Sequence, residues 1–158
     1  MFQVRYQFDF EMAHKLDSAF SKACTDTIHG HSYKVEVFVE SMILNDSGMV
    51  IDFGLLAKVC KGLQEMYDHA TLLSQKTVAR VLRRTGKLRR SDTKRANALF
   101  GKKLLICRYN PTAEQMAGAF FYYIKAKLAE LDFCLVRSAR LVSVRVHETD
   151  HGWAEHSA

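Results

Sequence analysis

Hydrophobic and polar positions alternate along the first part of the chain. Strand side chains repeat every two residues, so this pattern predicts a strand over residues 1–14. The apolar face of this strand carries Phe8, Phe10, Met12 and His14. A second strand is predicted over residues 29–40, with an apolar face formed by His29, His31, Tyr33, Val35, Val37 and Val39. Both strands therefore place histidine at one end of an apolar face.

Beyond the turn sequence NDSG (45–48), the apolar spacing changes to three and four. This predicts an amphipathic helix with Asp52 as its N-cap, ending near Tyr67. A second helix is predicted from Thr112 to about residue 131, because Thr112 and Gln115 form a capping-box pattern. The apolar stripes of the two helices are Phe53, Leu56, Val59, Cys60, Leu63 and Tyr67, and Ala113, Met116, Ala117, Phe120, Phe121, Ile124 and Leu128.

A last alternating strand is predicted over residues 139–148, with an extra strand in the apolar run KLLICRY (103–109). On the last strand we expect Val142, Val144 and Val146 to share a face with Glu148. An antiparallel sheet with both helices on one side buries these faces, which predicts an α+β fold. With 158 residues and no linker rich in Gly or Pro, we expect a single domain over 1–158.

The segment 74–103 is a basic insert. Residues 76–103 hold 11 Lys or Arg and one acid, a net charge of +10; the whole chain carries +6, so the remainder carries −4. The sequence predicts a short helix around Val78 and Val81, and a solvated loop for RRTGKLRRSDTKR (83–95). The chain is therefore an acidic domain with one basic insert. Its positive net charge alone is weak evidence for a nucleic-acid partner.

Composition is ordinary for a soluble globular protein, with 48% hydrophobic and 25% charged residues. We find no secretory signal pattern and no apolar run of membrane-spanning length, so no membrane partner is expected. The four cysteines, Cys24, Cys60, Cys107 and Cys134, are widely separated. This predicts reduced thiols in a cytoplasmic protein.

His29 and His31 point the same way on their strand, with Gly30 between them. Alone, this pair could be a metal site or two histidines bonded to ordinary partners. His14 ends the neighbouring strand on its apolar face, so pairing of the strands would bring three imidazoles together. Three neutral imidazoles suit Zn²⁺ with an open fourth position, the form of a catalytic site. Cys24 could instead supply a fourth ligand and close a structural site.

Four further residues have both a structural and a chemical interpretation. Cys24 is either a small packing residue or, near a cation, a thiol whose lowered pKa makes it a base. Asp68 and His69 either cap the end of the first helix or form a proton-transfer pair. Glu148 lies at a strand end, where a glutamate is common.

Six motifs in order resemble the 6-pyruvoyltetrahydropterin synthase and 6-carboxytetrahydropterin synthase superfamily. They are FEMAH (10–14), Cys24 with HGHSY (29–33), GMVIDFGLL (48–56), YDHATL (67–72), NPTAEQMA (110–117) and VHETDHGWA (146–154). The resemblance covers nearly the whole chain except the basic insert. It implies the tunnelling fold, a four-stranded antiparallel sheet with two helices on one face, in trimeric barrels that assemble into a hexamer.

The resemblance also implies the site and the reaction. The substrate would be 7,8-dihydroneopterin triphosphate, converted with Zn²⁺ to 6-carboxy-5,6,7,8-tetrahydropterin, acetaldehyde and triphosphate on the queuosine pathway. The implied zinc ligands are His14, His29 and His31, the implied catalytic residues are Cys24, Asp68 and His69, and the implied pterin anchor is Glu148.

Two alternatives stay open at this level. The first is the pyruvoyl-forming branch, which eliminates triphosphate but keeps the three-carbon side chain; we favour the carboxy-forming branch because the compact chain resembles bacterial members. The second is a non-enzymatic zinc protein whose insert binds RNA. For the insert itself, the interpretations are a solvated loop, an RNA contact, or a triphosphate contact by Arg83, Arg84, Arg89 and Arg90.

Overall fold

The structure, a computed structural model, describes residues 1–83, 88–131 and 138–158. Its strands are β1 (Phe2–Lys15), β2 (His29–Ser41), β3 (Ala70–Ser74), β4 (Leu104–Cys107), β5 (Arg140–His147) and β6 (Trp153–Ser157). Its helices are α1 (Lys22–Asp26), α2 (Phe53–Tyr67), α3 (Gln75–Val81), α4 (Arg90–Phe100) and α5 (Ala113–Ala129). None of these helices is long and apolar enough to cross a bilayer.

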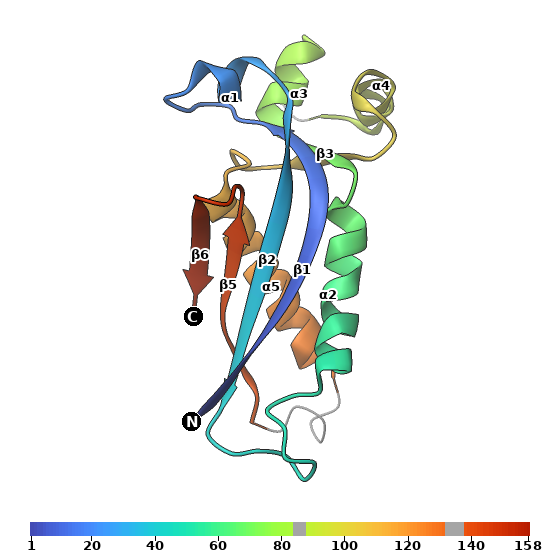
Figure 1. Cartoon of the computed structure of the whole chain (residues 1–158). Helices are drawn as coiled ribbons and strands as arrows, with labels where there is room; N and C mark the ends of the chain where they lie inside the picture. The colour runs from blue at the N-terminus through green and yellow to red at the C-terminus, as the bar shows by residue number, and fades with distance from the viewer. Residues whose placement is uncertain (84–87, 132–137) are drawn as a thin grey trace.

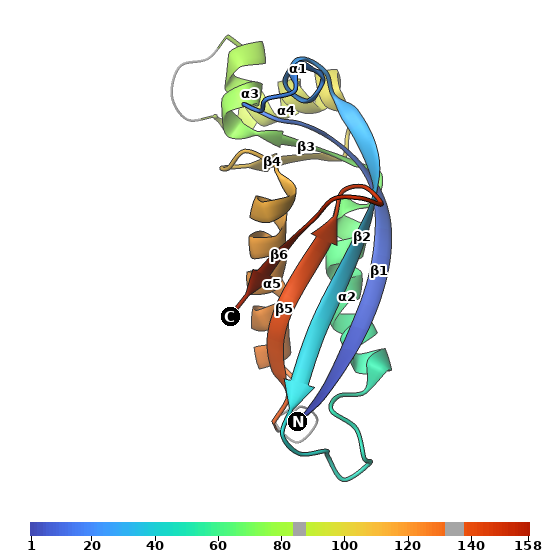
Figure 2. The same ribbon diagram turned by 60° about the vertical axis from the view of Figure 1, so that its left-hand side comes forward.

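One sheet runs through the structure in the order β4-β3-β1-β2-β5-β6. The strands β1, β2 and β5 pair antiparallel, as predicted, and β6, which was not predicted, pairs antiparallel with β5. In contrast, β3 pairs parallel with both β1 and β4. Helices α2 and α5 lie on the same face of this sheet (Figures 1 and 2). The predicted α+β layout with two helices on one face is confirmed. The sheet has six strands instead of the predicted four, because β3 and β6 were not expected, and it is not wholly antiparallel, because β3 pairs parallel with β1 and β4.

The two long helices begin at the predicted caps. The Asp52 carboxylate accepts from the amides of Gly54 and Leu55, and the Thr112 hydroxyl accepts from the amide of Gln115. These bonds satisfy amides that have no partner inside the helix. The helices bury Leu56, Val59, Cys60, Leu63 and Tyr67 of α2, and Met116, Ala117, Phe120, Phe121 and Ile124 of α5.

Most predicted core positions of the two helices are buried, but Ala113 and Leu128 of α5 are only half-buried and one position of α2 is exposed. Phe53 was expected in the apolar stripe but is 53% exposed, at the first residue of α2. Cys60 is a packing residue as predicted, and burial raises its pKa to about 12. Cys107 is also buried and unpaired, and Cys134 lies outside the described residues.

The apolar face of β5 differs from the prediction. Leu141, Val144 and Val146 are buried, whereas Val142 is only half-buried. The reason is a shift in the pairing with β2 between Phe38 and Val39, which skips one residue of β5 and moves its side chain off the core face. The alternation of valines therefore assigned Val142 to the wrong face of β5.

The described part of the basic insert is folded, and the predicted solvated loop over 83–95 is wrong from residue 90 onward. Residues 84–87 of that predicted loop, Arg84 among them, lie outside the described residues. Helix α4 begins at Arg90, where the Asp92 carboxylate accepts from the amide of Arg89. Its buried residues, Asp92 and Ala96, are few. A separate hydrophobic cluster joins Ala96 to Leu73, Val78 and Leu82. The helix was missed because most of its apolar partners come from other segments.

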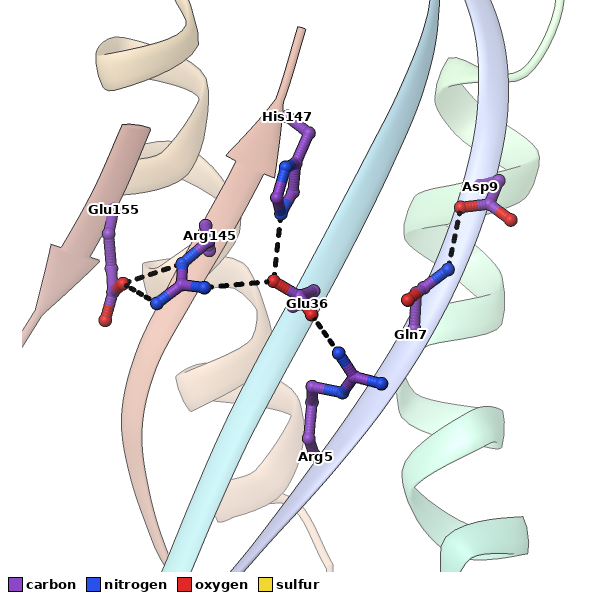
Figure 3. A network of polar contacts seen from close by, with 7 residues as sticks. All are labelled: Arg5, Gln7, Asp9, Glu36, Arg145, His147 and Glu155. Atoms are coloured by element: carbon purple, nitrogen blue, oxygen red, sulfur yellow. Dashed lines mark hydrogen bonds and ion pairs between the residues drawn. The ribbon is translucent and has the colours of Figure 1, made fainter. Parts of the chain in front are cut away.

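A charged network lies on the face of the sheet opposite α2 and α5, centred on Glu36 of β2 (Figure 3). The Glu36 carboxylate accepts from Arg5 of β1, and from Arg145 at 3.3 Å and His147 at 2.9 Å on β5. Burial raises the pKa of Glu36, but the hydrogen bonds from His147 and Arg5 outweigh it and lower the pKa below its ordinary value of 4.5. Arg145 also bonds Glu155 of β6, so one cluster ties four strands together.

Replacing Glu36 with glutamine is expected to lower the free energy of unfolding at pH 7 by about 1–2 kcal/mol, discounted for the exposure of Arg5. A depressed carboxyl pKa stabilises the fold above the unfolded pKa, and this stabilisation is lost as pH falls through the folded value. The difference between wild type and variant should therefore shrink below about pH 4.5. Urea unfolding at pH 7 and at pH 3.5 measures it.

The matched control is Glu65→Gln, which removes an exposed ion pair to Lys61 on α2. That change should alter the free energy of unfolding by less than about 0.5 kcal/mol at either pH. A pH-independent loss in Glu36→Gln would show that packing, and not the carboxylate charge, stabilises the four strands.

Candidate active site

Three histidines meet where β1 and β2 pair. His14 lies directly opposite His29 in the antiparallel register, and His31 lies opposite Met12. The ligand nitrogens of the three histidines all lie within 4.8 Å of one another, and His14 Nε2 is 3.1 Å from His29 Nε2. The predicted convergence is therefore present.

Carbonyl oxygens fix the orientation of two of these rings. His14 Nδ1 donates to the carbonyl of Pro111 at 2.8 Å, and His29 Nδ1 donates to the carbonyl of Thr27 at 3.2 Å. Because a carbonyl can only accept, these bonds leave the lone pair of each ring on Nε2. Such outer bonds are the usual way in which a protein orients metal-binding histidines.

The chemistry of the three histidines fits a divalent metal. His14 is fully buried, and His31 Nε2 is a buried nitrogen without a hydrogen-bond partner among the described residues. Burial lowers the pKa of both His14 and His31, which favours the neutral form that binds metal. Tetrahedral zinc with Zn–N bonds of about 2.0–2.1 Å would hold its nitrogens about 3.4 Å apart. The Nε2 atoms of His14 and His29, 3.1 Å apart, are close to that spacing, and every pair in the cluster lies within 4.8 Å.

Glu148 lies beside this cluster, just beyond the end of β5. Its Oε1 is 3.3 Å from His14 Nε2. Burial and the nearby Glu148 charge together raise the pKa of Tyr33, whose hydroxyl is 3.3 Å from His14 Nδ1. Glu148 also lines a hollow of about 320 Å³, together with Leu16, Thr112, Ala113, Glu114, Gly152, Trp153 and Ala154.

Asp68 and His69 form a bonded pair at the turn from α2 to β3. Asp68 Oδ2 is 2.8 Å from His69 Nδ1, and Asp68 Oδ1 accepts from the Glu11 amide at 3.1 Å. The Glu11 amide and then His69 lower the pKa of Asp68, so it is a carboxylate that orients the imidazole. His69 has a left-handed backbone, φ 55°, uncommon for a residue other than glycine. The pair is exposed, and His69 shares a hollow of about 390 Å³ with His31.

Cys24 lies on α1, in the segment between β1 and β2. Its carbonyl accepts from the Leu16 amide at 2.9 Å, two residues beyond His14, and its side chain is half-buried. Within the part of the chain that the structure describes, the candidate metal cluster contains the three histidines without Cys24. The geometry thus leaves Cys24 near the site but outside the set of ligands.

Asp17 anchors the segment that carries Cys24. Its carboxylate accepts from the hydroxyls of Ser74 at 2.5 Å and Thr77 at 2.7 Å, at the start of α3. Its amide donates to the Asn110 side chain at 2.6 Å, and that side chain donates to the carbonyl of Ser18. The basic insert is therefore bonded directly to the segment beside the histidines.

The comparison with known families identifies the chain. The family described as 6-pyruvoyl tetrahydropterin synthase matches residues 3–158. The chain belongs to this family. Membership of this family supports a pterin synthase function, as the sequence predicted in general terms. The three histidines could hold a metal ion.

Curated relatives of this pterin synthase family agree with the assignment. A 6-carboxy-5,6,7,8-tetrahydropterin synthase of Helicobacter pylori (strain ATCC 700392 / 26695) is 31% identical over 153 residues, covering 96% of this chain and 70% of the relative. An enzyme of the same name from Rickettsia bellii is 28% identical, covering 89% of this chain and 93% of the relative.

Solved structures confirm the tunnelling fold of the family. An uncharacterized protein of Wolinella succinogenes superposes with a TM-score of 0.74 at 21% identity, covering 99% of this chain and 97% of the other. The 6-pyruvoyl tetrahydropterin synthase of Caenorhabditis elegans gives a TM-score of 0.63 at 19% identity, with 99% and 95% covered. At these identities the likeness concerns the fold.

Several residues near the site were not predicted to take part in it. Pro111 was given no role in the site from the sequence, where it stands only within the motif NPTAEQMA, yet its carbonyl orients His14. Thr112, Glu114 and Trp153 line the hollow beside Glu148. Their positions inside the motifs NPTAEQMA and VHETDHGWA were the only sequence signal available.

Proposed function

We propose that this protein converts 7,8-dihydroneopterin triphosphate and one water molecule to 6-carboxy-5,6,7,8-tetrahydropterin, acetaldehyde and triphosphate. The observation that carries the proposal is the cluster of His14, His29 and His31 beside Glu148 and its hollow. The names of the curated relatives from Helicobacter pylori and Rickettsia bellii support the carboxy-forming branch.

In this proposal, Zn²⁺ held by the three histidines would act as a Lewis acid toward the hydroxyls of the substrate side chain. The Glu148 carboxylate accepts two parallel hydrogen bonds from the guanidine-like edge of the pterin, which fixes the orientation of the ring. Cys24 as thiolate removes a proton from the side chain. His69, oriented by Asp68, returns a proton elsewhere on the substrate.

The second candidate is the pyruvoyl-forming reaction, because the matching family is described by that name. The two reactions differ in the fate of the three-carbon side chain. Incubation of the zinc-loaded protein with the triphosphate substrate, followed by mass analysis, is expected to give the carboxy product and acetaldehyde. A product with an intact three-carbon side chain would assign the protein to the pyruvoyl-forming branch. Unconverted substrate would favour the alternative that the protein is a non-enzymatic metal-binding protein.

The same assay tests the pterin anchor. Glu148→Gln keeps the shape of the side chain but loses its charge, and charge-assisted hydrogen bonds contribute about 1.5–3 kcal/mol. We expect KM to rise about 10-fold to 100-fold, with the product unchanged. Glu114→Gln, which alters another carboxylate of the same hollow, is the matched control. An equal rise in KM for both variants would assign the effect to the net charge of the hollow.

We infer that the active form is a homo-oligomer, a trimer or hexamer. Two observations favour it: β4 and β6 are the outer strands of the sheet and each pairs with a single neighbour, and Asp68 and His69 are exposed to an approaching copy. Unpaired edges are the usual sites of pairing between chains. Light scattering of the purified protein tests this, and a monomer at working concentration would refute it.

A further inference from the structure

The described part of the basic insert carries exposed Lys and Arg side chains on and beside two helices, α3 and α4. Helices α3 and α4 lie together at one end of the molecule, beside β3 and β4 (Figures 1 and 2). The cluster of Leu73, Val78, Leu82 and Ala96 packs them together. The exposed cations of this unit, here called the basic surface, are Lys76, Arg80, Arg83, Arg89, Arg90, Lys94 and Arg95.

The placement of these cations on α4 is unfavourable for the helix alone. Arg90 and Lys94 are four residues apart, where like charges repel each other. They also lie in the first half of the helix, where the helix dipole disfavours positive charge. Among the described residues, no ion pair joins Arg90, Lys94 or Arg95 to a carboxylate. A bound polyanion would offset the repulsion between these cations, and its negative charge would interact favourably with the first half of the helix.

The basic surface is separate from the hollow that we assign to the pterin. None of its cations lines that hollow, which is formed by residues around Glu148. They extend over two helices, and α4 alone is about 16 Å long. A ligand with phosphates repeated along a chain matches this extent better than a single small molecule.

We propose that the basic surface binds the phosphate backbone of a nucleic acid. The sequence argued against such a partner because the rest of the chain is acidic, but the described cations of the basic surface lie on or next to two helices that pack against each other. None of the exposed residues of α3 and α4 is aromatic, so the surface offers Lys and Arg without a platform on which bases could stack. Contacts from Lys and Arg to phosphates do not read the base sequence. Binding should therefore be independent of base sequence and strongly dependent on salt.

The test compares wild type with the triple variant Arg90→Gln, Lys94→Gln, Arg95→Gln. Binding of a fluorescent 20-nucleotide RNA and a DNA of the same sequence is measured by anisotropy at several salt concentrations. The variant is expected to bind at least about 10-fold more weakly at 50 mM salt, with the slope of log affinity against log salt smaller by about 2. The RNA and DNA arms identify which backbone is preferred.

The matched control is Lys58→Gln, Lys61→Gln, Lys125→Gln, which removes three exposed cations from α2 and α5. It should leave RNA binding and its salt slope unchanged. The basic-surface variant should melt no lower than wild type, because like-charge repulsion is relieved, and should keep the wild-type KM for the pterin triphosphate.

Three results would overturn the proposal. Equal weakening in the two triple variants would mean that only net charge matters. Binding of wild type to anionic lipid vesicles but not to RNA or DNA would assign the surface to membranes. A raised KM for the pterin triphosphate in the basic-surface variant would assign it to the substrate instead.

Discussion

Replacing His31 with alanine is expected to remove tight zinc binding and, in the zinc-free protein, to leave the stability unchanged or higher. The reason is that His31 Nε2 is buried and has no hydrogen-bond partner among the described residues. An unsatisfied buried nitrogen costs free energy unless a ligand occupies it. The variant therefore loses a metal ligand and a destabilising polar atom at once.

The size of the effect follows from linkage. Loss of one of three ligands should weaken zinc binding by at least about 100-fold, because even outer-sphere partners contribute 10-fold to 100-fold. At zinc concentrations 100 times the wild-type Kd, wild type gains about 2.7 kcal/mol and the variant much less. For a protein of 158 residues this is about 5–10 °C in Tm. Thermal melts with and without zinc, and metal content by mass spectrometry, measure both parts.

His151→Ala is the matched control, because His151 is exposed and lies outside the cluster. It should keep the zinc-dependent rise in Tm. If His31→Ala kept the zinc content and the zinc-dependent rise of wild type, the three-histidine site would be wrong. A fall in stability of zinc-free His31→Ala would mean that packing of the ring outweighs its unsatisfied nitrogen.

Replacing Cys24 with alanine is expected to reduce turnover by about 1,000-fold, while zinc content and Tm stay at wild-type values. Loss of a general base costs about 100-fold to 10,000-fold, and 1,000-fold corresponds to about 4 kcal/mol of activation free energy. The fold should tolerate the change, because Cys24 is half-buried on a short helix with no buried residues. Single-turnover kinetics with the triphosphate substrate and zinc analysis of the same samples measure it.

Cys60→Ala gives the opposite pattern and serves as the control. Cys60 is buried among the apolar residues of α2, so its loss should lower Tm but keep turnover. If Cys24→Ala lost its zinc together with its activity, Cys24 would be a fourth ligand and the site a closed structural one. Wild-type turnover by Cys24→Ala would exclude the thiolate from the reaction.

The pattern of the sequence was sufficient for much of the fold, and the resemblance for the family. Alternation alone placed His14, His29 and His31 on apolar strand faces, because the two-residue repeat is a property of any strand. The caps Asp52 and Thr112 marked the starts of both long helices, because capping depends on side chains close in sequence.

Features formed by distant residues were predicted poorly. The short strands β3, with its parallel pairing, and β6 were missed, because β3 pairs with segments far away in sequence and β6 has no buried residue. Helix α4 was missed because Ala96 is buried against Leu73, Val78 and Leu82 of other segments. Val142 was assigned to the wrong face, because the register shift depends on β2.

For the site, the sequence by itself determined the kinds of side chain and the strand faces on which they lie. The tertiary structure decided the rest: the register that sets His14 opposite His29, the Pro111 carbonyl that turns His14 Nε2 toward the cluster, and Glu148 at 3.3 Å. The physical reason is the distance along the chain over which each interaction acts. Periodicity and capping act over a few neighbouring residues, whereas metal-site geometry requires positions from both ends of the chain to be fixed within a fraction of an ångström.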